Sequence, residues 1–196
     1  MTHYRKLMAS CGIVGLLFLC VFLSACAGII VGGAATSAVV ANDPRTTGTF
    51  VEDQSIELKA AKKLNEDTEL KDQTNINVTS YNQVALVSGQ APTASLKKRA
   101  VDIVSAIEKI RHVHDEIEIS APSSMMSRTN DTVLTTKVKT KLFANDQLNA
   151  AHIKVVSESG TVYLLGLVSN QDAALAAEIA STTGGVRKVV KLFEQL

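Results

Sequence analysis

Between residue 50 and the C-terminus, apolar residues recur with two alternating periods, one typical of helices and the other of strands. Ile56, Ala60 and Leu64 recur every fourth residue, which places them on one side of a helix. Two short apolar runs flank "SYNQ" and predict a hairpin of two strands. A second helical period covers residues 96–107, and residues 113–119 alternate as a strand does. The predicted order of elements is α-β-β-α-β.

The rest of the chain repeats this pattern. Asp53, Ile56 and Lys59 match Asp131, Leu134 and Lys137 at a constant offset, which shortens by one residue in the hairpin and again in the second helix. In the second copy, residues 153–166 form the hairpin, residues 173–180 begin the second helix, and residues 186–193 close the sheet. A crossover between parallel strands is right-handed, so both helices of a copy lie on one face of its sheet. The sequence predicts an α+β fold of two modules, each a small three-stranded mixed sheet with two helices on one face.

Residues that interrupt helices and strands separate the patterned segments and give the predicted domain boundaries. Pro44 and Gly48 interrupt a polar connection before the first module, and "APSSMMSRTN" separates the two copies. The first module is placed at residues 50–120, a linker at 121–129, and the second module at 130–196. A module of this size has a thin core, so we expect the two copies to pack on each other.

The N-terminus has the order of a secretory signal. Arg5 and Lys6 precede an apolar run, and small residues follow it. Leu23-Ser24-Ala25-Cys26 resembles the bacterial lipobox, in which the cysteine is acylated and becomes the first residue of the mature chain. We therefore predict a lipoprotein signal peptide at residues 1–25 and a lipidated N-terminus and linker at 26–49. The alternative is an uncleaved span over residues 7–41, which is long enough to cross a bilayer but is interrupted by glycines.

Cysteine usage and charge agree with cleavage. The three cysteines, Cys11, Cys20 and Cys26, all precede residue 27, so only Cys26 remains after cleavage and no disulfide can form. Removing residues 1–25 leaves 18 basic and 19 acidic residues, a net charge of −1 without histidine, which gives nucleic acid no cationic surface to bind. We expect no cofactor other than a covalent diacylglycerol and an N-acyl chain on Cys26. In Gram-negative lipoproteins, an aspartate after the acylated cysteine opposes sorting to the outer membrane, and this chain has Ala27 there. By this resemblance, the expected location is the periplasmic face of the outer membrane.

Three segments suggest chemistry but fit simpler roles. His112, His114 and Glu116 share one face of a predicted strand, yet no clear fourth metal ligand accompanies them, so we interpret them as a solvated outer face and predict no metal site. Ser95-Leu96-Lys97-Lys98 has the Ser-x-x-Lys spacing of some acyl-enzyme hydrolases without their other motifs. "STTGGVRK", residues 181–188, matches no phosphate loop, and its glycines are typical of a helix stop. The sequence thus predicts no enzyme.

Four stretches carry a resemblance to a known family: "DPRTTGT", "INVTSYNQVALVSGQAP", "NDTVLTTKVKTKL" and "GLVSNQDAALAAEIAS". With the lipobox, their order resembles that of dual BON-domain outer-membrane lipoproteins of the DolP (YraP) type. The resemblance implies a lipid-anchored protein whose second module binds anionic phospholipid such as phosphatidylglycerol and supports outer-membrane integrity. It also implies links to sites of cell division and to the β-barrel assembly machinery.

In the family, the phospholipid surface is centred on the first helix of the second module. Carried over to this chain, the surface comprises Val133, Lys137, Val138, Lys139, Lys141 and Phe143. A family member has tryptophan at the position of Val133, so an interfacial anchor is missing here.

The residues themselves give this helix some support. With Leu134, Val138 and Leu142 turned to the core, Val133, Lys137, Thr140 and Phe143 are predicted to face outward. Residues 132–144 contain no acidic side chain, whereas the matching helix of the first module contains Glu57 and Glu66 and is expected to repel an anionic surface. Lysines that merely solvate a helix are the simpler interpretation.

Two other functional classes stay open at this stage. One is a periplasmic protein-protein adaptor that acts on the β-barrel assembly machinery or on envelope proteins at the division site. The other is a hydrolase, for which the sequence offers no complete set of catalytic residues.

Overall fold

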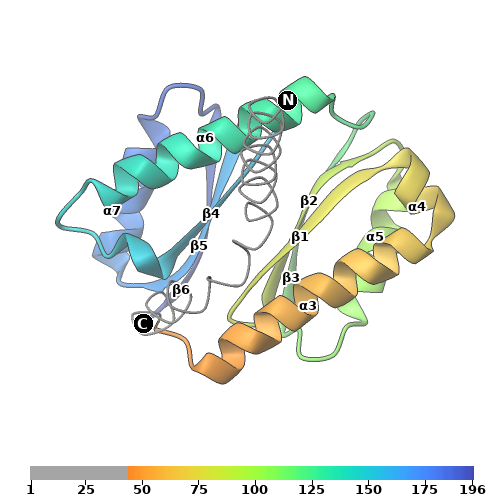
Figure 1. Ribbon diagram of the computed structural model, residues 1–196, viewed down its shortest axis with the longest axis horizontal. Helices are drawn as coiled ribbons and strands as arrows, with labels where there is room; N and C mark the ends of the chain where they lie inside the picture. The colour runs from red at the N-terminus through yellow and green to blue at the C-terminus, as the bar shows by residue number, and fades with distance from the viewer. Residues whose placement is uncertain (1–43) are drawn as a thin grey trace, which may run out of the picture. The chain divides into compact units, whose positions relative to one another are not determined.

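The computed structural model describes residues 44–196, all of which belong to one compact unit, Asn42–Leu196 (Figure 1). The predicted signal peptide, the acylated Cys26 and the segment up to residue 43 lie outside the described residues. Among the helices that are described, none has the length and apolar character needed to cross a bilayer.

The first module contains three helices and a three-stranded sheet. Its elements are α3 (Thr47–Glu66), α4 (Thr68–Gln73), β1 (Asn75–Tyr81), β2 (Val84–Ala91), α5 (Ala94–Ser105) and β3 (His112–Ile119). Strand β2 lies in the middle, antiparallel to β1 and parallel to β3. Helices α3 and α5 cover one face of this sheet (Figure 1).

The second module repeats the arrangement. Its elements are α6 (Met125–Phe143), the short 3₁₀-helix η2 (Ala150–His152), β4 (Ile153–Glu158), β5 (Thr161–Val168), α7 (Asn170–Ser181) and β6 (Lys188–Gln195). Strand β5 pairs with antiparallel β4 and parallel β6, and α6 and α7 cover one face (Figure 1). The predicted α+β class, with two mixed sheets and helices on one face of each, is confirmed.

The helices begin earlier than the sequence pattern indicated. Helix α6 starts at Met125, inside the segment predicted as a linker, because the Ser124 hydroxyl accepts a hydrogen bond from the Ser127 amide and caps it. Helix α3 starts at Thr47 and is capped by Thr46 in the same way. The short helix α4 was not predicted; Asp67 ends α3 and caps α4 by accepting from two amides.

Each hairpin turn is tied to the first helix of its module by a buried aspartate. The turn residues Asn82 and Gln83 have positive φ, as do Ser159 and Gly160 in the second module. Asp53 of α3 accepts from the amides of Asn82 and Gln83 at 2.8 and 2.7 Å. The repeat therefore preserves a charged hydrogen-bond acceptor that fixes an otherwise unfavourable turn.

The two sheets pack on each other through the faces that the helices leave free. Tyr81 and Leu86 of the first module form a buried cluster with Tyr163 and Leu165 of the second. At the edge of this interface the Lys154 ammonium lies 2.6 Å from a carboxylate oxygen of Glu57. The expected contact between the copies is thus present, and it buries part of the helix-free face of each sheet.

Candidate functional site

All but one of the predicted lipid-binding residues lie on the solvent-exposed side of α6, with Lys137 and Lys141 on one flank and Lys139 on the other. Val133 and Phe143 are 47% and 65% exposed, and Lys137, Lys139 and Lys141 are also exposed. Val138 is fully buried in the core beside Leu134 and Leu142. Val138 is therefore a core residue that packs α6 onto the sheet. Its place in the predicted lipid-binding surface is wrong, because a ligand could reach it only if the module unpacked.

The charge on this face is positive and largely unopposed. In the part of the chain that the structure describes, neither Lys137 nor Lys139 forms an ion pair, and Lys141 donates only to the carbonyl of Thr182 at 3.2 Å. The single acidic residue of α6, Asp131, is buried and accepts from the amides of Ser159 and Gly160, both at 2.9 Å. An anion approaching α6 therefore meets ammonium groups first.

Sequence reasoning missed a row of threonines on the same helix. Thr129, Thr132, Thr136 and Thr140 each donate their hydroxyl to the carbonyl four residues earlier, at 2.9–3.0 Å. A hydroxyl held against its own helix leaves the methyl group as the outward part of the side chain. The face that looks polar in the sequence is thus largely apolar, and the helical spacing of these threonines was the available signal.

A groove of about 580 Å³ runs between α6 and the turn that follows α7. Its lining residues are Thr132, Val133, Thr136, Lys137, Thr140, Lys141, Thr183 and Gly184. We call it the threonine groove. Its long wall contains Thr132, Thr136 and Thr140 of this row, and its short wall comes from the segment 181–188 that the sequence marked only as a helix stop. Helix α7 already ends at Ser181 with Thr182 as its C-cap, so the glycines are not the helix stop that the sequence suggested; they lie in the turn beyond the cap, where Gly185 has φ +106°.

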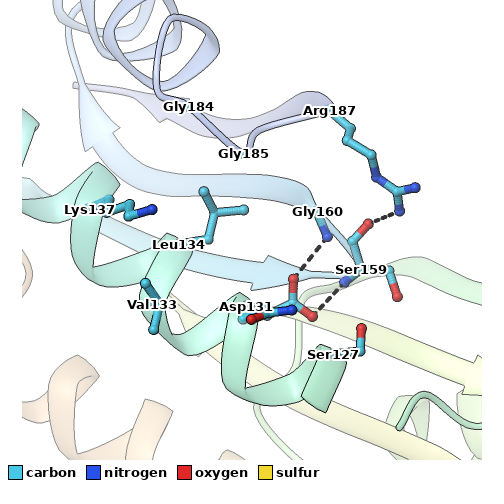
Figure 2. Close-up of a pocket in the computed structure, with 11 residues that line it drawn as sticks. Ser127, Asp131, Val133, Leu134, Lys137, Ser159, Gly160, Gly184, Gly185 and Arg187 are labelled. Atoms are coloured by element: carbon cyan, nitrogen blue, oxygen red, sulfur yellow. Dashed lines mark hydrogen bonds between the residues drawn. The ribbon is translucent and has the colours of Figure 1, made fainter. Parts of the chain in front are cut away.

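A second, more polar hollow of about 510 Å³ adjoins the groove and shares Val133, Lys137 and Gly184 with it. Figure 2 shows Gly184 and Gly185 across from Leu134 and Lys137, with Asp131 hydrogen-bonded to the β4–β5 turn. The Arg187 side chain points away from Lys137 and donates to the Ser159 carbonyl (Figure 2). The two hollows meet at Lys137, so a ligand with a polar and an apolar part could occupy both.

The histidine cluster is only partly the solvated outer face that the sequence suggested, because His112 alone of the three is exposed. His114 and Glu116 are half-buried where the first sheet faces the second module, and Glu116 and Tyr163 line the same hollow there. Burial, followed by the neighbouring His112, lowers the pKa of His114. Over residues 44–196, no three metal-ligating side chains lie close enough together to hold an ion. Ile119, at the end of the same strand, is 57% exposed.

The Ser-x-x-Lys pair is likewise not a catalytic arrangement. The Lys98 ammonium forms an ion pair with Asp102 at 2.6 Å, one helical turn further along α5. Both side chains are largely exposed, so the pair solvates the outer face of the helix. The structure therefore gives Ser95 no paired base.

The family model for the BON domain matches residues 52–121 and again residues 130–196. The chain is 39% identical over 176 residues to outer membrane lipoprotein DolP of Haemophilus influenzae, covering 90% of this chain and 91% of that protein. It is 37% identical to a 21 kDa hemolysin of Actinobacillus pleuropneumoniae, with coverages of 76% and 77%. It is 30% identical to osmotically-inducible protein Y of Escherichia coli K12, with 72% of each chain covered.

Proposed function

The chain belongs to the dual BON-domain family of DolP-type envelope lipoproteins, and we propose that its second module binds anionic phospholipid and thereby supports the integrity of the outer membrane. The observation that carries this proposal is the exposed face of α6, where apolar side chains and unpaired lysines lie together. The family is non-catalytic, and we propose no reaction and no cofactor for this chain.

The physical case for α6 combines two favourable terms. A lysine close to an anionic bilayer contributes on the order of 1 kcal/mol, and this face carries three. Val133 and Phe143 add apolar surface that bare lysines lack, and this surface gains when it moves from water to the interface. Neither term alone gives firm binding, but together they orient the helix on the membrane.

We further propose that Cys26 carries the lipid anchor and that the modules lie on the periplasmic side of the outer membrane. Two or three acyl chains hold a protein on a bilayer durably, whereas one chain binds only reversibly. The anchor keeps α6 near the phospholipid surface, so even weak contacts of α6 are occupied for much of the time.

A vesicle-binding experiment tests the role of α6. Both cores lie within residues 42–196, so a fragment of these residues retains them whole and lacks the anchor. The fragment should sediment with phosphatidylglycerol vesicles, and Lys137→Glu with Lys139→Glu should weaken binding at least tenfold, since four units of charge change near the surface.

The matched control is Lys62→Glu with Lys63→Glu on α3, the corresponding helix of the first module, where both lysines are exposed. This control changes the net charge of the fragment by the same amount but leaves α6 intact. Equal losses in the two double variants would mean that overall charge, and not α6, governs binding. Undiminished binding by the α6 variant would remove this helix from the proposal.

A second candidate function is a periplasmic adaptor for other envelope proteins, such as the β-barrel assembly machinery or proteins of the division site. It is favoured by Val51 and Leu58, which are 60% and 72% exposed on α3, two helical turns apart. A photo-crosslinker at position 143 in the full-length protein separates the candidates. Adducts with lipid favour the first function, and adducts with protein favour the second.

A further inference from the structure

We propose that the threonine groove holds one acyl chain of an anionic phospholipid, with the phosphate of the same lipid beside Lys137. This inference rests on the proposed function and goes beyond it, because it replaces contact with a membrane surface by a site for a single lipid molecule. It assigns a binding role to Thr136, Thr140 and Gly184, which the lysine-bearing face does not include.

The wall of the groove suits a hydrocarbon chain. The Thr136 and Thr140 hydroxyls are occupied by the carbonyls of Thr132 and Thr136, so the methyl groups line the space. Lining by methyl groups makes the space unfavourable for water and favourable for methylene groups. Its volume of about 580 Å³ lies within the usual range for pockets that bind small ligands.

Gly184 is the most informative residue of the site. Its neighbour Gly185 has φ +106°, a conformation that favours glycine, but Gly184 does not adopt a left-handed backbone. A Cβ atom added at Gly184 would meet nothing within 4 Å. Neither backbone conformation nor packing within the protein therefore requires a glycine here, and the missing side chain leaves the mouth of the groove open.

The first module shows what happens when this position is filled. Its turn has the same hydrogen bonds, since the Ile107 amide donates to Val104 as the Thr183 amide donates to Ala180, at 3.0 Å in each. The left-handed residue Lys109, with φ +74°, takes the place of Gly185. Glu108 then stands where Gly184 stands. In that module, a carboxylate occupies the position that opens the groove in the second.

Charge complementarity selects an anionic lipid as the occupant. The groove is flanked by Lys137 and Lys141, and its lining contains no acidic side chain. The carboxylate of Asp131 in the adjoining hollow accepts hydrogen bonds from two amides, one at each oxygen, and is buried. With the lipid phosphate at Lys137, one acyl chain would lie in the apolar groove and the polar headgroup of the same lipid would face the adjoining hollow.

The test uses Gly184→Leu in the fragment of residues 42–196, with Ser181→Leu as the control. Both variants add the same apolar side chain to an exposed position after or at the end of α7, but only Gly184 lines the groove. A single-lipid site predicts that Gly184→Leu binds phosphatidylglycerol vesicles roughly tenfold more weakly, since each excluded methylene costs about fourfold in affinity. A flat membrane-contacting surface predicts the opposite, because the added leucine would strengthen binding or leave it unchanged.

A second measurement locates the chain directly. Phosphatidylglycerol with a nitroxide on its acyl chain should broaden the amide resonances of Thr136 and Gly184 in the wild-type fragment more than those of Leu58 on α3. Gly184→Leu should abolish this difference while its circular dichroism spectrum stays that of the wild type. Should the variant unfold, the broadening in the wild type still decides the question.

The outcomes separate this inference from the proposed function. A wild-type fragment that ignores phosphatidylglycerol vesicles overturns both. Binding by the wild type with no weakening in Gly184→Leu, or with equal broadening at Leu58, overturns the groove and leaves the proposed function standing. Free glycerophosphoglycerol, which has the headgroup but no acyl chains, should compete poorly, and strong competition would also count against a chain in the groove.

Discussion

Helices α3 and α6 occupy equivalent places in the two modules and both expose lysines, yet only α3 also carries acidic side chains outside the core. Their buried positions correspond one to one: Ile56 with Leu134, and Leu64 with Leu142. On α3, the carboxylate of Glu57 forms an ion pair with Lys154 of the second module. On α6, no acidic side chain reaches the outer face. The repeat therefore preserves the core and leaves the surface free to diverge.

The same comparison holds for exposed apolar groups. The positions of Val51 and Leu58 on α3 correspond to Thr129 and Thr136 on α6, so each helix carries an apolar row at the same register. The opposite wall differs, since the first module has Glu108 where the second has Gly184. Glu108 in place of Gly184 is thus one of the differences between the two surfaces, and Lys62 in place of Thr140 is another.

The largest expected effect concerns the two buried aspartates. Asp53 accepts hydrogen bonds from the Ser80 hydroxyl and two turn amides and also pairs with Arg45 at 2.7 Å, whereas the hydrogen bonds of Asp131 come from two amides. Asp53→Ala should lower the free energy of unfolding by about 4 kcal/mol and Asp131→Ala by about 2 kcal/mol. Urea unfolding followed by circular dichroism measures both values.

Asparagine at either position serves as the control, because it keeps one oxygen acceptor and removes the charge. Each asparagine variant should recover part of the loss seen with alanine. Equal destabilisation by Asp53→Ala and Asp131→Ala would contradict the comparison, since it would mean that Arg45 and Ser80 add nothing to the turn of the first module.

An exchange of residues between the modules should have the next largest effect. Gly184→Glu puts the side chain of the first module into the groove, where it both fills space and repels phosphate, so binding to phosphatidylglycerol vesicles should fall about twentyfold. Glu108→Gly in the wild-type background should raise binding about twofold by opening the equivalent turn beside Lys59. Vesicle sedimentation measures both changes, and a gain of binding in Gly184→Glu would refute the role assigned to this position.

Much of the fold could be predicted because the helical and strand periods in this chain are clean. Leu134, Val138 and Leu142 were expected on the core side from spacing alone, and all three are buried there. The ends of the helices were less predictable, because capping by Ser124 depends on one hydrogen bond that leaves no periodic signal. Val138 was included in the predicted site by family resemblance, but it faces the core. A binding helix also contains inward-facing residues, and the resemblance does not separate these from the residues that contact the ligand.

The groove could not be predicted from the sequence. Threonine counts as polar in a hydropathy pattern, and only the structure shows that Thr132, Thr136 and Thr140 turn their hydroxyls inward. The turn at Gly184 lies far from α6 along the chain and meets it only when α7 packs beside α6. Contacts of this kind between distant segments have no counterpart in local spacing.

A smaller effect is expected from Thr136 itself. Thr136→Val keeps a methyl group on the groove wall and should leave vesicle binding within about twofold of the wild type. Thr136→Ser keeps the hydroxyl but loses the methyl group, and binding should fall about fourfold, the value of one methyl-sized apolar group. The reverse order, with valine weak and serine unchanged, would show that the hydroxyl and not the methyl group contacts the ligand.

The smallest effect concerns the residue before each hairpin turn, which is Tyr81 in the first module and Glu158 in the second. Burial is the main cause that raises the pKa of Glu158 above its ordinary value of 4.5, although Gln90 donates to its carboxylate at 2.8 Å. The folded protein therefore holds this proton more tightly than the unfolded chain. The contribution of Glu158 to the free energy of unfolding is largest below pH 4.5 and falls as the pH rises through the raised pKa.

Glu158→Gln isolates this contribution because glutamine cannot ionise but can still accept from Gln90. Relative to the wild type, the variant should gain stability between acidic and neutral pH, and the two urea-unfolding curves should converge near pH 4. Tyr81→Phe is the matched control in the first module and should shift the curve equally at every pH in this range, since neither tyrosine nor phenylalanine changes charge there. A wild-type protein whose stability relative to Glu158→Gln increases toward neutral pH would show that the carboxylate is stabilised in its ionised form, and that Gln90 and Asn77 outweigh burial at this position.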